Sequence, residues 1–303
     1  MSIYDRTVQF DEREGRYKSM ETQVERFLDR LAELTDEARM SREFKDWLEI
    51  QSRFHRYSFS NSVLIQLQKP DASKVAGFRR WRDDFNRHVR GGEEAIWIWA
   101  PMIKNVCVEC GKGLRYHDHS SCTVGDGERW VNSLSGFRPV PVFDVSQTKG
   151  EPLPELDTRA KGDAGSLVPA LERAAESLGI DLEIVDAHRW EHRAKGYAMG
   201  DRARVLRRDD AATASTVVHE MAHIVAGHTG RSTLVEGEHS RSHYEIVAES
   251  VAYVVGSWLG LDMENSKFYL AAWRGDREKI KEGLESIAST SKEIIRNVEP
   301  WLT

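Results

Sequence analysis

The spacing of apolar residues predicts helices along most of the first ninety positions. In the charged N-terminal segment, apolar side chains recur at intervals of three and four, which places them on one face of a helix. Further helices are expected over 44–55 and 77–90, with a polar turn at 57–62 between them. The residues with helical spacing are Phe27, Leu28, Leu31 and Leu34 in the first segment and Phe78, Trp81 and Phe85 in the last.

Two later segments have the composition of β-strands. Residues 95–100 combine isoleucine and tryptophan, and residues 139–145 are rich in valine. Pro139 and Pro141 lack a backbone N–H, so we expect the second strand at the edge of a sheet. The two strands are expected to pair around the long insertion that separates them.

The second half of the chain predicts a separate, mostly helical unit. Segment 148–165 has the prolines, glycines and charges of a linker. We therefore expect an α+β fold with one domain at 1–150 and a second domain, with a small sheet, at 160–303. The expected elements after the linker are a helix over 167–178, strands over 182–185, 196–199 and 203–206, two apolar helices around 219–223 and 243–259, and a helical tail over 266–301.

Composition narrows the class of protein. The 303 residues are 40% hydrophobic and 30% charged, which is typical of globular chains, and the net charge is −6. No run of 18 apolar residues occurs, and the N-terminus has no apolar signal core, so we expect a cytoplasmic protein without membrane contact. All three cysteines lie between Cys107 and Cys122, which does not suggest a secreted disulfide scaffold.

The most informative motif is HExxH at 219–223. On a helix, His219 and His223 lie four residues apart on one face, so both imidazoles can bind one metal ion. Glu220 lies beside His219 and can reach a water molecule held on that metal. The pattern predicts metal-assisted hydrolysis, most often of a peptide bond. The alternative is a pair of partly exposed helix histidines with a solvated glutamate.

A zinc site of this kind needs a third protein ligand. The next apolar helix carries Glu245 and Glu249 four residues apart, and we expect Glu245 to bind the metal and Glu249 to accept a hydrogen bond from a ligating histidine. An exchange of these roles between Glu245 and Glu249 is also consistent with the sequence. The remaining alternative is that both residues are surface glutamates. Arg241, His243 and Tyr244 are candidates to stabilise the oxyanion. Zinc is the expected metal, although manganese or cobalt binds such ligands as well.

The insertion between the two strands, at about 105–130, carries a second metal-ligand pattern. Cys107 and Cys110 flank a tight turn followed by glycine, Cys122 provides a third thiolate, and His117 or His119 completes a Cys3His set. We expect a structural zinc ion there, in addition to the catalytic one. A redox-active cysteine pair or unliganded thiols are the alternatives.

The window 50–90 differs from the rest of the acidic chain. It holds nine basic and three acidic residues, a net charge of +6, with interleaved aromatic residues. Basic grooves with aromatic platforms bind single-stranded nucleic acid. The alternative is that the aromatic residues pack in the core and the basic ones form a solvated face. The candidate DNA-binding residues are Arg53, Arg56, Tyr57, Lys74, Arg79, Arg80, Trp81, Arg87 and Arg90.

These segments together resemble a known family, the ArdC-like antirestriction proteins. Residues 219–223 and 245–249 resemble the metallopeptidase half of these proteins, which is related to the ImmA/IrrE peptidases, and 266–273 fits their C-terminal helix. The cysteine-bearing insertion departs from the family pattern. The segments that resemble the family's N-terminal single-stranded-DNA-binding domain are 57–61 (YSFSN), 75–81 (VAGFRRW), 90–101 (RGGEEAIWIWAP) and the closing segment 142–148 (VFDVSQT).

The resemblance implies a DNA-associated zinc metallopeptidase that protects incoming DNA of mobile elements from restriction. Its N-terminal domain would bind single-stranded DNA, and its C-terminal domain would be zincin-like and act on a peptide or protein substrate. Two other hypotheses remain. In one, the protein only occupies single-stranded DNA and blocks nucleases, with zinc serving the fold. In the other, it is a regulatory peptidase that cleaves a repressor without contacting DNA.

Overall fold

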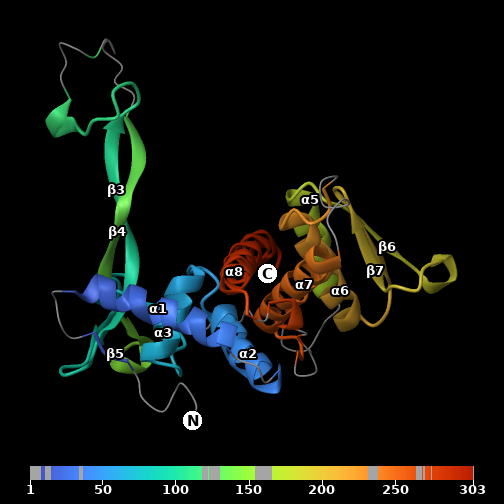
Figure 1. Ribbon diagram of the computed structural model, residues 1–303, viewed down its shortest axis with the longest axis horizontal. Coiled ribbons are helices and arrows are strands. Elements are labelled where there is room, and N and C mark those ends of the chain that lie inside the picture. The colour runs from blue at the N-terminus through green and yellow to red at the C-terminus, as the bar shows by residue number, and fades with distance from the viewer. Residues whose placement is uncertain are drawn as a thin grey trace.

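The computed structural model describes residues 8–10, 15–33, 37–117, 122, 130–153, 166–230, 238–263, 268, 270–273 and 275–302. The first half contains helices and a long antiparallel hairpin, and the second half packs helices beside a small sheet (Figure 1). This mixture of helix and sheet agrees with the predicted class.

The described elements follow the predicted order closely. The helices are α1 (Arg16–Glu33), α2 (Glu37–Arg53), α3 (Phe59–Gln68), α4 (Phe78–Asp83), α5 (Leu167–Ser177), α6 (Asp210–Val225), α7 (Glu238–Leu259) and α8 (Arg277–Val298). The strands are β1 (Val75–Ala76), β2 (Arg87–Val89), β3 (Ile96–Cys107), β4 (Trp130–Asp144), β5 (Thr148–Gly150), β6 (Asp181–Val185), β7 (Gly196–Met199) and β8 (Arg202–Leu206).

The helix expected over 77–90 is shorter than predicted. It ends at Asp83, and the chain turns at Asn86, which has a φ of 49°. Residues 87–89 then form β2, which pairs antiparallel with β5. The predicted linker at 148–165 therefore begins with a strand, β5. Backbone pairing of β2 with this distant strand overrides the helical spacing that predicted a helix as far as residue 90.

The hairpin of β3 and β4 confirms the predicted pairing of the two strands. The strands pair antiparallel from Ile96 opposite Val142 to Cys107 opposite Trp130, and they form an arm that projects from the helices (Figure 1). β1 pairs with the other side of β4 at 143–144 only. Pro139 and Pro141 lie outside that short stretch, so β4 has the edge character there that its prolines predict.

Helix α3 covers the outer edge of β3 with two amide side chains. Asn61 bonds the N–H and the carbonyl of Trp99, each at 2.9 Å. Gln68 does the same for Trp97, at 2.8 and 2.9 Å. These amides replace the backbone groups of a missing strand, and they protect an edge that would otherwise be open to other chains.

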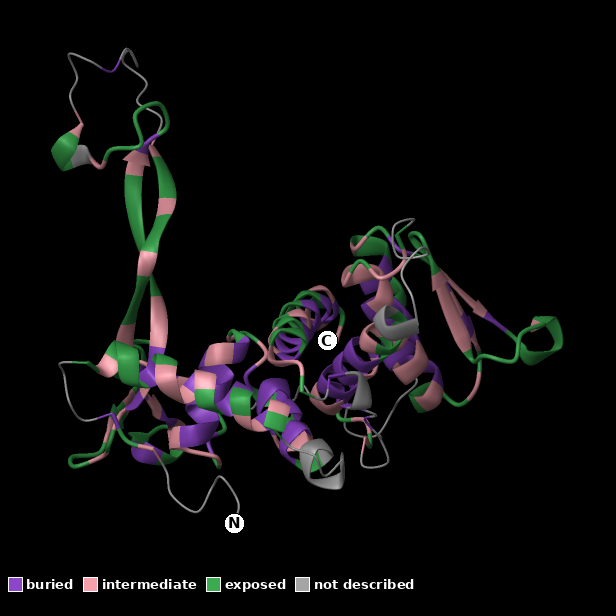
Figure 2. Cartoon of the chain, in the orientation of Figure 1, coloured by how far each residue is buried: buried purple, intermediate pink, exposed green. Residues whose placement is uncertain are grey.

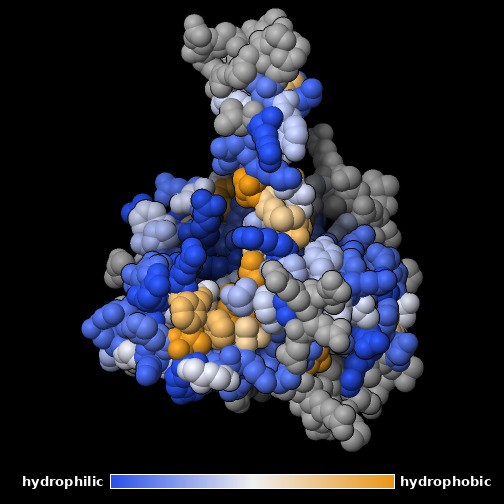
Figure 3. All heavy atoms as spheres, turned by 90° about the vertical axis from the view of Figure 1, so that its left-hand side faces the viewer, coloured by the Kyte–Doolittle hydropathy of each residue, from blue (hydrophilic) through white to orange (hydrophobic). Residues whose placement is uncertain are grey.

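Beyond the helices, the arm leaves apolar side chains in solvent. At its stem, α1 covers the tryptophans, with the Arg16 guanidinium 3.6 Å from the Trp97 ring centre. The strands beyond are mostly exposed (Figure 2), and hydrophobic residues gather on the stem in the face shown in Figure 3. The exposed large apolar residues of the two strands are Met102, Ile103, Val131, Leu134 and Phe137.

The second half of the chain forms the predicted strands and helices around one small sheet. Its strand order is β6-β8-β7, with β6 parallel and β7 antiparallel to β8. α6 packs against both β7 and α7. The tail is helical from Arg277 to Val298, as its pattern predicts. Among the described helices, none is long and apolar enough to cross a membrane.

The largest hydrophobic core includes residues from both sides of the predicted linker. It contains side chains of α1, α2 and α3 together with those of α5 to α8. Phe44 of α2, for example, packs edge-on against Trp273, with ring centres 5.6 Å apart. A smaller core lies between α2, α3 and the base of the hairpin. Packing in the described part of the chain thus joins the two predicted domains, and their division at 150–160 stays a prediction.

Candidate metal centre

Helix α6 presents the HExxH residues from a firmly anchored position. The helix begins at Asp209, whose carboxylate accepts a hydrogen bond from the N–H of Ala212 at 2.8 Å. Val217, Val218 and Met221 are fully buried and hold α6 in the core. The histidines share another face of the same helix, on which α7 packs. Their positions are therefore set by the core.

The structure brings together three of the predicted ligands. The Nε2 atoms of His219 and His223 lie 3.2 Å apart. Oε2 of Glu245 lies 3.6 Å from the first and 3.7 Å from the second. Two ligands at about 2.1 Å from a tetrahedral zinc ion are separated by roughly 3.4 Å. The three atoms therefore form a triangle that can hold a metal ion.

The remaining nitrogen of each histidine has its own partner. Nδ1 of His219 lies 3.4 Å from Oε2 of Glu249, and Nδ1 of His223 lies 3.3 Å from Nδ1 of His228. Such partners fix the ring orientation and the tautomer of a metal-binding histidine. The Glu245 carboxylate thus lies between the two Nε2 atoms, whereas Glu249 and His228 contact the Nδ1 atoms on the other side of the rings.

His228 is a residue that the sequence analysis missed. The chain reverses after α6, and the N–H of His228 donates to the carbonyl of His223 at 2.8 Å. The His228 ring also stacks on Tyr244, with centres 4.3 Å apart. Its one signal in the sequence is a histidine directly after Gly227, since glycine commonly follows the end of a helix.

The pKa values of the residues in this cluster depend strongly on one another. Burial opposes protonation of His219, but hydrogen bonds with Glu245 and Glu249 outweigh it and raise its pKa to about 10. Hydrogen bonds from His219 and His223 lower the pKa of Glu245. Burial, with the neighbouring His223, lowers the pKa of His228 to about 3, which keeps its ring neutral. Without metal, the cluster is an imidazolium–carboxylate group whose proton a cation can replace.

The carboxylate of Glu220 is buried against β7. The residue is 6% exposed, and this burial raises its pKa. A Cβ at Gly196 would lie 2.6 Å from Oε1 of Glu220 and 2.9 Å from Cγ2 of Thr216. Only glycine at this position therefore lets β7 lie this close to α6. The absence of a side chain at Gly196 keeps the edge strand in contact with Glu220.

The three oxyanion candidates on α7 have different surroundings. Tyr244 is linked to the triangle through its stacking on His228, which contacts His223. His243 accepts a hydrogen bond at 2.8 Å from the indole N–H of Trp273, and burial lowers its pKa. Arg241 is exposed. Tyr244 is thus the candidate with the shortest chain of contacts to the metal ligands.

The second predicted ligand set also comes together in part. Cys107, Cys110, His117 and Cys122 offer ligand atoms that all lie within 4.8 Å of one another. His119, the other candidate for the fourth ligand, lies outside the described residues.

Several of the predicted DNA-binding residues make contacts within the fold. Trp81 is 1% exposed and its indole donates to the carbonyl of Phe143, which agrees with the alternative that this ring packs in the core. Arg53 donates to the carbonyl of Ala72 at 2.8 Å, and Arg87 donates to Oγ1 of Thr148 at 2.8 Å. Tyr57 is half-buried. A role of these residues in DNA binding stays a prediction.

The other predicted cations lie on the surface. Lys74 and Arg79 are exposed. Phe78, which the sequence pattern assigns to the core beside Trp81, is 51% exposed on α4. The remaining arginines form ion pairs that are weak in water. These pairs are Arg56–Glu299, Arg80–Asp84 and Arg90–Glu93.

Comparisons with known proteins give the following similarities. No protein-family model matches the chain. An uncharacterized protein from Bacillus anthracis is 24% identical over 283 residues, covering 84% of this chain and 47% of that protein. The chain therefore spans about half the length of this relative.

Two crystal structures of the antirestriction protein ArdC from the R388 plasmid are also similar. The Mn(II)-bound structure has a TM-score of 0.49 and 16% identity, with 94% of this chain and 98% of that chain covered. The metal-free structure has a TM-score of 0.45 and 17% identity, with 80% and 86% covered.

Proposed function

We propose that the protein is a zinc-dependent metallopeptidase of zincin type. The observation that carries this proposal is the triangle of His219, His223 and Glu245 with Glu220 on the same helix. Two imidazoles and one carboxylate are a donor set that suits zinc and leaves a coordination position open. The contacts of the two Nδ1 atoms with Glu249 and His228 support the same arrangement.

The residues of the site have distinct roles in the proposed reaction. A zinc ion bound there would activate a water molecule and polarise the scissile carbonyl. Glu220 accepts a proton from the attacking water and returns it to the leaving amine. The raised pKa of its buried carboxylate makes it a stronger base than an exposed glutamate. Glu249 and His228 keep the two imidazoles in the tautomers that leave Nε2 available for metal.

The edge strand β7 suggests how a substrate is held. β7 is the last strand of its sheet and runs beside Glu220, with Gly196 against the carboxylate. An extended peptide can add to such an edge by backbone hydrogen bonds. Its scissile bond then lies beside α6. We propose an unfolded or extended segment of a protein as the substrate class.

Metal removal tests the peptidase. We expect the zinc-loaded protein to cleave an unfolded model protein, to lose this activity with a chelator and to regain it when zinc is added. His219→Ala should lose metal and cleavage together, because it removes one corner of the triangle. His188→Ala, at an exposed histidine outside the site, is the matched control. Cleavage that persists after chelation would contradict the proposal.

We further propose that the first half of the chain binds single-stranded DNA and that the protein acts in antirestriction. The resemblance of 57–61, 75–81 and 90–101 to the ArdC-like domain supports this, and so does the surface of α4. There, Phe78 is exposed next to Arg79, and Lys74 lies just before β1. A base can stack on the phenyl ring while the cations contact phosphates.

Oligonucleotide binding tests the DNA proposal. We expect Phe78→Ala to weaken binding of a fluorescent single-stranded oligonucleotide by about 1–3 kcal/mol, since it removes a stacking surface. Arg79→Ala should lower the slope of affinity against salt by about one. Arg173→Ala, an exposed arginine on α5 paired with Glu176, is the charge-matched control. An equal loss in the control, or binding independent of salt, would reject this surface.

A further inference from the structure

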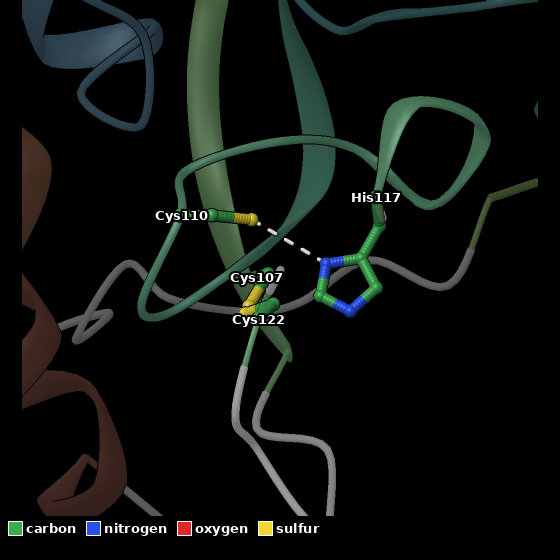
Figure 4. A group of neighbouring side chains, drawn as sticks. All are labelled: Cys107, Cys110, His117 and Cys122. Atoms are coloured by element: carbon green, nitrogen blue, oxygen red, sulfur yellow. Dashed lines mark hydrogen bonds between the residues drawn. The ribbon is translucent and has the colours of Figure 1, made fainter. Parts of the chain in front are cut away.

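At the tip of the β3–β4 arm, four potential ligands point toward one another (Figure 4). Sγ of Cys107 lies 3.6 Å from Sγ of Cys122, and Sγ of Cys110 lies 3.4 Å from Nδ1 of His117. Two sulfurs bound tetrahedrally to zinc at about 2.3 Å are separated by roughly 3.8 Å, and a sulfur and a nitrogen by slightly less. These two separations match a tetrahedral zinc site, and all four ligand atoms lie within 4.8 Å of one another, whereas a disulfide requires about 2.05 Å.

The backbone around the first two cysteines is shaped to present their sulfurs. The N–H of Gly111 donates to the carbonyl of Cys107 at 2.9 Å, and the N–H of Cys107 donates to the carbonyl of Lys112 at 3.0 Å. Gly111 has a φ of 68°, which a residue with a side chain rarely adopts.

Among the residues that the structure describes at the tip, several large apolar side chains lie in solvent. Cys107 and Cys122 are buried, at 4% and 9% exposure, and Trp130 is half-buried with its ring 5.3 Å from that of His117. Val108 is 51% and Tyr116 73% exposed. A bound metal ion can supply the folding free energy that a hydrophobic core supplies elsewhere.

We propose that Cys107, Cys110, His117 and Cys122 bind one zinc ion that orders the tip of the β3–β4 arm. Three thiolates and one imidazole fill all four positions of zinc, so this site is structural and holds no reactive water. The tip lies far from α6 and α7 (Figure 1), so the ion is distinct from the one proposed between those helices. In this proposal the ion orders the far end of an arm whose two strands carry exposed apolar residues.

Zinc content of the full-length protein tests this site. We expect two zinc ions per chain in the unmodified protein and one in Cys110→Ser. His117→Ala should also lose one ion, whereas His119→Ala and Lys112→Ala should keep both. The proposal is overturned if Cys110→Ser and His117→Ala both retain the zinc content of the unmodified protein. The assignment of His117 as the fourth ligand is overturned if His119→Ala loses zinc and His117→Ala does not.

Cobalt substitution separates the two sites and keeps the test independent of the peptidase. Sulfur-to-cobalt charge-transfer absorption should be present in the unmodified protein and in His219→Ala, and absent from Cys110→Ser. If His219→Ala keeps both ions and Cys110→Ser loses one, the arm site stands and the triangle fails. The reverse pattern overturns the arm site alone. Unchanged far-ultraviolet circular dichroism in Cys110→Ser would show that a lost ion reflects a lost ligand.

Discussion

Glu220→Gln is expected to lower peptide hydrolysis by about 10²–10⁴-fold while the metal at the triangle stays bound. The amide cannot accept a proton from the attacking water, but it matches the carboxylate in size. This match matters because Oε1 of Glu220 lies in the space left by Gly196, and a larger side chain would displace β7. Hydrolysis rates and zinc content, measured on the same preparation, check the prediction.

Glu249→Gln is the control for Glu220→Gln. Glu249 contacts Nδ1 of His219, so this change should weaken metal binding by roughly 10–100-fold and spare hydrolysis at saturating zinc. If Glu220→Gln retained full hydrolysis, Glu220 would not be the proton acceptor.

The same variant tests the biological hypotheses. If Glu220→Gln still protected DNA from restriction and the surface variants at Phe78 and Arg79 did not, the protein would act as a DNA-binding antirestriction factor without catalysis. If protection were lost with Glu220→Gln and oligonucleotide binding were absent, a regulatory peptidase would be favoured. The comparison requires only that both variants are folded and expressed at equal levels.

Asp144→Ala is expected to lower the free energy of unfolding by roughly 3 kcal/mol or more. Asp144 is 1% exposed, and its Oδ1 accepts the N–H groups of Ser73 at 2.8 Å and Lys74 at 3.0 Å. Its Oδ2 accepts the N–H of Ser146 at 2.8 Å. Alanine leaves three part-buried N–H donors without their acceptor where β1, β4 and the following turn meet. Chemical denaturation measures the loss.

Asp144→Asn separates charge from shape at this position. It keeps one oxygen for Ser73 and Lys74 but sets an amide group against the N–H of Ser146, so we expect an intermediate loss. Burial alone would raise the pKa of Asp144, but hydrogen bonds from Ser146, Ser73 and Lys74 lower it below its usual 3.8. Its contribution to stability is therefore complete above about pH 3.8 and is lost as the pH falls through the lowered value. The three proteins should converge in strongly acidic solution, and a pH-independent difference would contradict this account.

Local patterns along the chain were sufficient to predict the three residues of the triangle and Glu249, which the structure brings together, but not His228. His219 and His223, and Glu245 and Glu249, lie one helical turn apart, and helical periodicity depends only on the residues between them. The hairpin at 196–206 and the ends of α6 also follow from turn and cap residues that act over a few positions. The cysteine motif at 107–110 is of the same kind.

Contacts between distant segments were decided by the tertiary structure. The same helical spacing placed Phe78 and Trp81 together in the core, yet only Trp81 is buried. The Trp81 indole donates to the carbonyl of Phe143, whereas the Phe78 ring meets the Phe143 ring edge-on and stays 51% exposed. Asn61 appears in the sequence as a turn residue, and only the fold shows that it pairs with Trp99 of β3. Likewise, Arg53 and Arg87 count as positive charges in the sequence, but in the structure Arg53 donates to the carbonyl of Ala72 and Arg87 donates to the carbonyls of Thr148 and Gly150.

The sequence by itself determined which residue types lie on one face of α6 and of α7, because that is set by the helix alone. Only the tertiary structure decided that Glu245 faces both histidines, that His228 holds His223, and that Gly196 lies against Glu220. Each of these contacts depends on how separate elements pack, and packing is determined by the whole core.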